Sequence, residues 1–187
     1  MSGVKEHAAR LRALFARAVL IGFVAVLPAQ QTDKEAIAGA TNYRRVEPLF
    51  ACGGGVTPEA VTQLKQIGFT SIINLRTPDE AGANVPVESA AAKRAGIKLI
   101  SIPFSARAPN ANEQLDRFLE AVADPANRPA YIHCAVGQRA AMMWMIKRVM
   151  LDGWSVEKAL AEAPSVGLTL ANLRQFALDY LKAHDKQ

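Results

Sequence analysis

Apolar residues in the second part of the chain recur in two alternating patterns. Short β-branched runs occupy positions 69–75 and 97–104, and segments with three- and four-residue apolar spacing occupy 56–68, 87–96 and 111–124. The runs predict buried strands and the spaced segments predict amphipathic helices. A further run at 128–134 predicts a strand. This alternation predicts an α/β domain with a central, mostly parallel sheet that helices cover on both faces.

The first predicted helix has clear start and stop signals. Thr57 is a capping residue, Pro58 suits the first turn, and Gly68 ends the pattern. The expected inward-facing residues of this helix are Val61, Leu64 and Ile67.

The chain after residue 134 reads as helical throughout. The predicted helices cover 139–153, 155–163 and 168–184. Methionines and aliphatic residues recur on one face of the first of them, which we interpret as a core face. The residues on this face are Met142, Met145, Ile146, Val149 and Met150.

Length and charge restrict the classes of function. A chain of 187 residues with 50% hydrophobic composition can bury one core, and we place that domain at 42–187. The formal net charge is +5, of which residues 1–29 carry +3. Because the remaining chain carries only +2, the sequence does not support nucleic-acid binding.

The N-terminal segment has the pattern of a secretory signal. Basic residues extend to Arg17, an apolar run follows from Ala18 to Leu27, and the small residue Ala29 suits a cleavage site. We expect residues 1–29 to be a signal peptide, and the mature protein to be periplasmic or secreted. The alternatives are an uncleaved anchor in the inner membrane and a buried N-terminal helix. A membrane would be a partner only if the segment is an anchor.

Cys52 and Cys134 are the only cysteines. With so few cysteines and so little histidine near them, no zinc site is expected. In an oxidising compartment the two thiols could pair, but their spacing does not decide whether they meet.

Cys134 follows the strand at 128–134 and precedes a helix. Ligands of parallel sheets gather at the carboxyl ends of the strands, and a helix start supplies N–H donors that stabilise anions and a thiolate. The short loop to Arg139 could turn its N–H groups around an oxyanion, and Arg139 could hold two oxygens at once. The loop residues expected to bind phosphate are Ala135, Val136, Gly137, Gln138 and Arg139.

The motif "HCAVGQR" resembles the His-Cys-x-x-Gly signature of cysteine-dependent dual-specificity and tyrosine phosphatases. The segments "GGGVTPEAVTQLKQIGFTSIINLRTPDE" and "DGWSVEKALAEAPSVGL" are similar to a bacterial branch of that superfamily, which is also found fused to β-lactamase-like hydrolase domains. The similarity covers 42–182. It implies a phosphatase-like fold in which Cys134 forms a phosphocysteine intermediate, Arg139 holds the phosphate and no metal or organic cofactor takes part.

The chain departs from that pattern at three places. The arginine comes one residue early, so that Ala140 stands at its usual position. No serine or threonine follows the arginine, and the loop "SARAPNAN" lacks the usual aspartic general acid. We select Asp79 as the first candidate for the acid and Glu80 as the second, because both follow another strand at the same edge of the sheet. The alternative for both is a solvated loop or a helix cap.

Four further residues have two interpretations each. His133 either supports the cysteine loop and lowers the thiol pKa, as the resemblance implies, or is a strand-end histidine with satisfied ring nitrogens. Arg76 either lines the anion site or pairs with Asp79 or Glu80. Arg107 either attracts phosphate or faces water. Cys52 is either a buried thiol or the disulfide partner of the catalytic cysteine.

The sequence thus predicts a phosphatase that hydrolyses phosphate monoesters, such as protein phosphotyrosine, with a phosphorylated protein or small molecule as partner. One alternative is a rhodanese-like sulfurtransferase, which also ends a parallel strand in a cysteine loop. The other is a phosphatase-like module that binds anions without turnover, favoured by the missing acid and hydroxyl.

Overall fold

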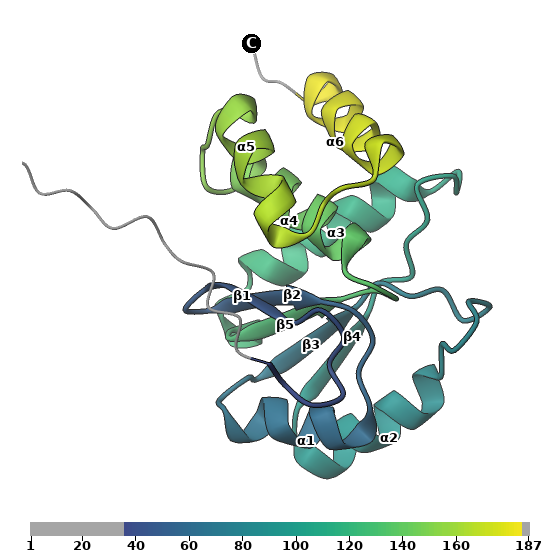
Figure 1. Ribbon diagram of the computed structural model, residues 1–187. Helices are drawn as coiled ribbons and strands as arrows, with labels where there is room; N and C mark the ends of the chain where they lie inside the picture. The colour runs from purple at the N-terminus through teal and green to yellow at the C-terminus, as the bar shows by residue number, and fades with distance from the viewer. Residues whose placement is uncertain (1–35, 185–187) are drawn as a thin grey trace, which may run out of the picture. The chain divides into compact units, whose positions relative to one another are not determined.

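The computed structural model describes residues 36–184, which form a five-stranded sheet between two layers of helices (Figure 1). The strand order is β1-β2-β5-β3-β4, and all pairs are parallel except β1 with β2. This confirms the predicted α/β class with a mostly parallel sheet and a helical C-terminal part. The strands are β1 Arg44–Glu47, β2 Phe50–Gly53, β3 Ser71–Asn74, β4 Lys98–Ser101 and β5 Ala130–His133.

The helices divide between the two faces of the sheet (Figure 1). One face carries the first two helices of the chain, and the other face carries the remaining four. A short 3-10 turn, Pro125–Asn127, precedes β5. The helices are α1 Pro58–Gln66, α2 Val85–Ala95, α3 Ala111–Ala123, α4 Gln138–Met150, α5 Val156–Val166 and α6 Ala171–Ala183.

Helix α1 follows the sequence signals closely. The Thr57 side chain accepts a hydrogen bond from the Ala60 N–H at 3.2 Å, and Val61 and Leu64 are buried. The prediction for Ile67 was wrong. Its side chain is 44% exposed, because the helix ends at Gln66 and Ile67 is the C-cap residue.

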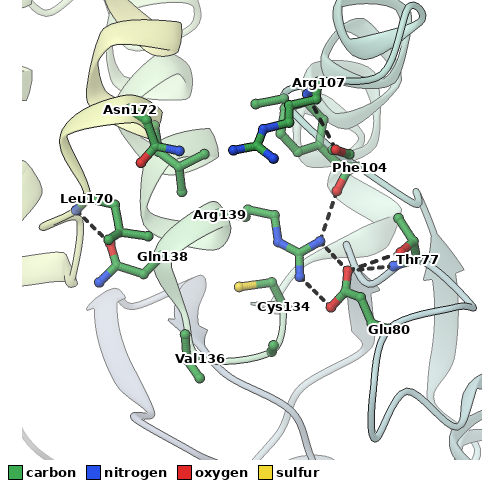
Figure 2. Close-up of a pocket in the computed structure, with 14 residues that line it drawn as sticks. Thr77, Glu80, Phe104, Arg107, Cys134, Val136, Gln138, Arg139, Leu170 and Asn172 are labelled. Carbon is green, nitrogen blue, oxygen red and sulfur yellow. Dashed lines mark hydrogen bonds and ion pairs between the residues drawn. The ribbon is translucent and has the colours of Figure 1, made fainter.

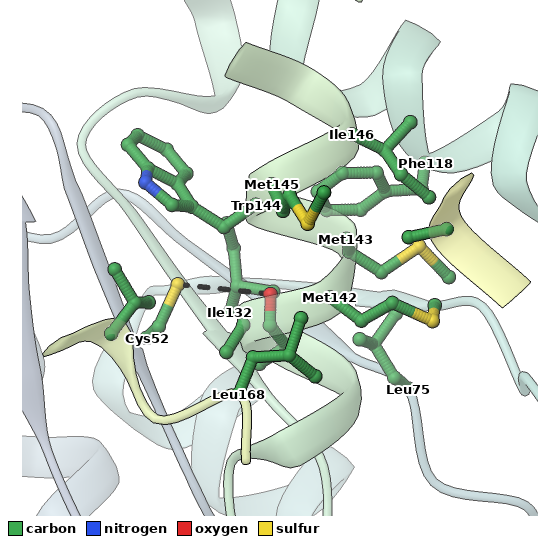
Figure 3. Packing of buried hydrophobic residues seen from close by; sticks show 14 of the residues in the cluster. Cys52, Leu75, Phe118, Ile132, Met142, Met143, Trp144, Met145, Ile146 and Leu168 are labelled. Carbon is green, nitrogen blue, oxygen red and sulfur yellow. Dashed lines mark hydrogen bonds between the residues drawn. The ribbon is translucent and has the colours of Figure 1, made fainter. Parts of the chain in front are cut away.

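Helix α4 lies at the centre of the larger core. Every residue from Ala140 to Arg148 is buried, and Figure 3 shows its methionines packed against Phe118 and Leu75. Of the predicted core face, Met142, Met145 and Ile146 are buried, and Val149 and Met150 are partly buried. The middle of the helix is therefore covered on all sides. At its C-terminal end, Lys147 and Arg148 are also buried. Their charges are compensated by ion pairs with Glu47, Asp152 and Glu162.

The hairpin of β1 and β2 was not predicted. The β1 sequence, Arg44–Glu47, is polar and only four residues long, so it lacks a hydrophobic period. Strand β2 is buried along its whole length and pairs with β5, with Cys52 opposite Ile132 and Gly53 opposite His133. This pairing brings the glycines after Cys52 beside the Cys134 loop.

The predicted signal or anchor segment, residues 1–29, lies outside the described residues. Within 36–184, no helix combines the length and the apolar character that a membrane span needs.

Candidate active site

Cys134 lies at the floor of a cavity of about 420 Å³ at the carboxyl end of β5 (Figure 2). The thiol is almost fully buried, at 1% exposure, yet it lines the cavity. The cavity is formed by the loop after β3, the β4–α3 loop, the Cys134 loop and the start of α6. The position agrees with the rule that parallel sheets place ligands at this edge.

The loop from Cys134 to Arg139 turns directly into α4. The Gly137 N–H donates to the Cys134 Sγ at 3.2 Å, and Gly137 is the N-cap residue of α4 with a φ of 98°. A residue with a Cβ would be strained at that φ, so glycine suits the turn. The N–H donor and the helix N-terminus both stabilise negative charge on the sulfur.

The glycines after β2 support the same loop from behind. Gly55 N–H donates to the Ala135 carbonyl at 3.0 Å, and Gly54 forms an antiparallel bridge with Val136. A Cβ on Gly54 would lie 2.6 Å from the Ala135 carbonyl oxygen. The close approach of two backbones therefore requires glycine at position 54.

His133 is fully buried and both ring nitrogens have partners. Its Nε2 lies 2.8 Å from Glu88 Oε1, and its Nδ1 lies 3.3 Å from the Cys134 carbonyl oxygen. Asn74 Nδ2 in turn donates to Glu88 Oε2 at 2.9 Å. The ring is thus a strand-end histidine with satisfied nitrogens, as its second interpretation states, and it also contacts the backbone of the cysteine loop.

Arg139 extends from the first turn of α4 to the loop after β3. Its Nη1 and Nη2 donate to the two carboxylate oxygens of Glu80, at 2.5 and 2.7 Å, as Figure 2 shows. Nη1 also donates to the carbonyl oxygens of Leu75 at 3.2 Å and Phe104 at 2.9 Å. Four acceptors therefore fix the plane of the guanidinium.

Glu80 and Arg139 each stabilise the charged form of the other. Partial burial alone would raise the pKa of Glu80, but hydrogen bonds from Arg139 and Thr77 and the charge of Arg139 lower it from 4.5 to about 2. Burial alone would lower the pKa of Arg139, but the hydrogen bond to Glu80 and the nearby Cys134 raise it. Both groups are charged at neutral pH, so Glu80 cannot donate a proton in this state.

The pairing leaves one edge of the guanidinium available. Arginine has five N–H donors, one on Nε and two on each Nη. Among the described residues, the Nε–H and the second Nη2–H of Arg139 have no oxygen acceptor. A hydrogen bond with the Cys134 side chain contributes to the raised pKa of Arg139. An oxyanion above the sulfur could therefore accept two hydrogen bonds without displacing Glu80.

Gln138 connects the cysteine loop to the α5–α6 loop through its side chain. Its Oε1 accepts from the N–H groups of Thr169 and Leu170, at 2.9 and 3.1 Å, and its Nε2 donates to Thr169 Oγ1 at 2.7 Å. Leu170 and Asn172 line the cavity just beyond this contact. The side chain therefore positions one wall of the cavity.

The other predicted residues are placed as follows. Asp79 is exposed and does not line the cavity, and hydrogen bonds from the Thr77 side chain and its own N–H lower its pKa. Arg76 pairs with Glu80 at 3.5 Å and donates to two loop carbonyls, which agrees with the structural interpretation. Arg107 lines the cavity. The carboxylate at the site is thus Glu80, the second candidate.

The two cysteines are free thiols. Burial raises the pKa of the Cys52 thiol well above its usual range, and its Sγ lies 4.0 Å from the Ala140 carbonyl oxygen (Figure 3). Cys52 is therefore a neutral core residue, as the first of its two interpretations states. Within residues 36–184, no group of three or more histidine, cysteine or acidic side chains has the arrangement of a metal site.

Sequence reasoning missed Glu88 and the role of the Gln138 side chain. Glu88 precedes Ala91 and Ala92 by three and four residues, so it shares their buried helix face. That spacing was a readable signal for a buried carboxylate. The Gln138 contacts join segments 31 residues apart, and no local pattern marks them.

Comparison with known proteins supplies the family. The family model "PTP-NADK: DSP-PTPase phosphatase fused to NAD+ Kinase" matches residues 23–177. The chain belongs to this family. A curated relative of this chain is "Probable NAD kinase 2, chloroplastic" of Oryza sativa subsp. japonica, which is 30% identical over 93 residues, 49% of this chain. The chain spans about a tenth of the length of that relative, since the match covers 10% of it.

Solved structures show the same fold. The "Putative phosphatase (DUF442)" of Shewanella putrefaciens CN-32 is 17% identical with a TM-score of 0.65, over 80% of this chain and 97% of its own. The catalytic core of the PP-IP phosphatase SIW14 from S. cerevisiae is 24% identical with a TM-score of 0.61, over 78% and 88%. P. aeruginosa TpbA is 20% identical with a TM-score of 0.60, over 78% and 86%. The PTP-NADK domain therefore has the fold of the cysteine-dependent DSP/PTP phosphatases.

Proposed function

We propose that the protein hydrolyses phosphate monoesters with Cys134 as the nucleophile. The observation that carries the proposal is the alignment of three groups above one sulfur. These are the Gly137 N–H, the N-terminus of α4 and the available edge of the Arg139 guanidinium. Together they form a site for a tetrahedral anion whose phosphorus lies over a thiolate.

The reaction has two steps. In the first, the Cys134 thiolate forms an S–P bond while the bond from phosphorus to the leaving oxygen breaks, and the leaving group takes the electron pair. In the second, water attacks phosphorus, the S–P bond breaks, and phosphate and the thiolate are released. Arg139 would hold the equatorial oxygens in both steps, and its orientation by Glu80 would avoid a reorganisation cost.

Apolar side chains in the cavity wall favour an aryl phosphate as the substrate. Val136 and Leu170 line it with side chains that are 54% and 48% exposed, which gives an apolar surface for an aromatic ring. A phenoxide is also a better leaving group than an alkoxide when no acid protonates it. P. aeruginosa TpbA, which shares the fold, has been crystallised with pTyr as a cysteine-to-serine variant. We therefore favour phosphotyrosine or a similar ester.

The test is hydrolysis of phenyl phosphate by the full chain in a reducing buffer with EDTA. We expect Cys134→Ser to abolish phosphate release and Arg139→Lys to lower kcat by roughly 10²- to 10³-fold. Cys52→Ala is the matched control, because it removes the other thiol from the core. We expect it to keep its activity, with a melting scan to confirm that it folds.

Three outcomes would contradict the proposal. Phosphate release that persists in Cys134→Ser would exclude this nucleophile. Thiocyanate formation from thiosulfate and cyanide, without phosphate release, would identify a sulfurtransferase instead. Phosphate binding without turnover of any ester would identify an anion-binding module.

A further inference from the structure

Arg107 is a cation at the cavity that the steps described above do not use. It belongs to the loop between β4 and α3, the loop that contains the segment "SARAPNAN". Figure 2 shows its guanidinium extending over the cavity toward Asn172, which comes from the opposite wall at the start of α6. Two groups that can donate hydrogen bonds therefore face each other above the level of Cys134.

Among residues 36–184, no acidic side chain pairs with Arg107. The cavity lining contains two arginines, but Glu80 is its one carboxylate among the described residues, and both oxygens of Glu80 are bound to Arg139. Arg107 makes one hydrogen bond in the described part of the chain, from its backbone N–H to Ser105 Oγ at 3.4 Å. By contrast, Arg128 is anchored by donating to the carbonyl oxygens of Val122 and Ala123.

The same loop lacks a proton donor. Residues 105–112 contain no aspartate or glutamate, and Glu80 is ionised by its pairing with Arg139. No carboxylic acid in the described cavity can protonate a leaving oxygen, so the leaving group departs as an anion. A fixed guanidinium on that side stabilises negative charge without transferring a proton.

We propose that Arg107 and Asn172 form a second anion subsite, and that the enzyme prefers phosphate esters or anhydrides whose leaving group carries a negative group of its own. Guanidinium binds phosphoryl and carboxylate oxygens in the same fork geometry, so either group can occupy the subsite. This inference rests on the proposed function, because it assigns the leaving-group side of the Cys134 reaction. The S–P and P–O bond changes are those already given, and the leaving group keeps its electron pair.

The experiment compares three probes with EDTA present. Phenyl phosphate has no second anion, 3-carboxyphenyl phosphate has a carboxylate on the ring, and inorganic pyrophosphate has a phosphoryl group next to the scissile bond. Each is tested with the wild type, Arg107→Ala, Arg107→Lys and Arg94→Ala. Arg94 is the control, because it is an exposed arginine on α2 that does not line the cavity.

We expect Arg107→Ala to lower kcat/KM by roughly 10- to 100-fold for one or both probes with a second anion. The loss for phenyl phosphate should stay below about threefold, because the apolar ring makes no charged contact. Arg107→Lys should recover part of the loss, since it keeps the charge but not the fork. Which of the two probes responds identifies the group that the subsite binds.

An equal loss for all three probes, or no loss for any, would overturn the subsite. The two proposals fail separately. If phenyl phosphate is hydrolysed and Cys134→Ser abolishes that activity, the proposed function stands whatever Arg107→Ala does. If Cys134→Ser keeps the wild-type rate, the proposed function fails first.

Discussion

The pair between Glu80 and Arg139 makes a quantitative prediction for Glu80→Gln. The amide keeps one oxygen acceptor but places an NH₂ group against the guanidinium, so one of the two charge-assisted hydrogen bonds is lost together with the charge attraction. The pKa of Glu80 falls from 4.5 to about 2, and at 1.36 kcal/mol per pKa unit this is at most about 3 kcal/mol. Because the side chain is 23% exposed, solvent screening reduces the expected loss to about 1–2 kcal/mol.

The pH dependence follows from the sign of that shift. A carboxylate with a lowered pKa in the folded state stabilises the protein above its unfolded pKa, here 4.5, and this contribution disappears as the pH falls toward 2. The wild type should therefore lose more of its free energy of unfolding than Glu80→Gln between pH 5 and pH 2. Urea unfolding at several pH values measures the difference. The control is Glu120→Gln, the same change at an exposed site on α3.

Activity distinguishes two roles of the same pair. If Glu80 orients Arg139, Glu80→Gln lowers kcat/KM for phenyl phosphate by roughly 10-fold, because the guanidinium must then be ordered when substrate binds. If Glu80 instead competes with phosphate for Arg139, kcat/KM rises. A rise, or parallel pH–stability curves for the wild type and the variant, would refute the orienting role.

Two further variants test residues near the cavity that are not part of its lining. Asp79→Asn should change kcat/KM by less than about twofold, because its side chain is exposed and outside the cavity lining; a loss of 10² or more would identify it as the general acid. Gly54→Ala should destabilise the fold by about 1–3 kcal/mol in urea unfolding and lower kcat, because the new Cβ would meet the Ala135 carbonyl oxygen at 2.6 Å. Full activity of Gly54→Ala would show that the loop tolerates displacement.

The sequence predicts the parts of this fold that carry local signals. Helix α1 has a cap, a proline and a glycine stop, and helix α2 ends at Gly96 in the left-handed conformation that favours glycine. Strand β1 has no such signal. Its residues other than Val46 are partly exposed, and Arg44–Glu47 become a strand through pairing with β2, with Arg44 opposite Cys52. Tertiary pairing therefore decides the element that local propensity leaves open.

The candidate site divides in the same way. Cys134 and Arg139 belong to one contiguous motif, so spacing alone is enough to select them as candidates. The carboxylate partner depends on which way adjacent side chains point on one loop. Asp79 faces solvent and Glu80 faces the cavity, although both follow the same strand. No alternation rule applies in a turn, so the order of the two candidates could not be decided from the residues.

Glu80 is one of the groups that hold the Arg139 side chain beside Cys134. Four residues separate Cys134 from Arg139, and Arg139 lies in the first turn of α4. The groups that hold its side chain come from the segments after β3 and β4: Glu80 and the carbonyls of Leu75 and Phe104. The loops after β3 and β4 therefore hold the guanidinium of Arg139 in place. Glu80, the one carboxylate in the lining of the described cavity, is ionised by this pairing. The reaction proposed above therefore assigns the stabilisation of the leaving group to a cation, Arg107.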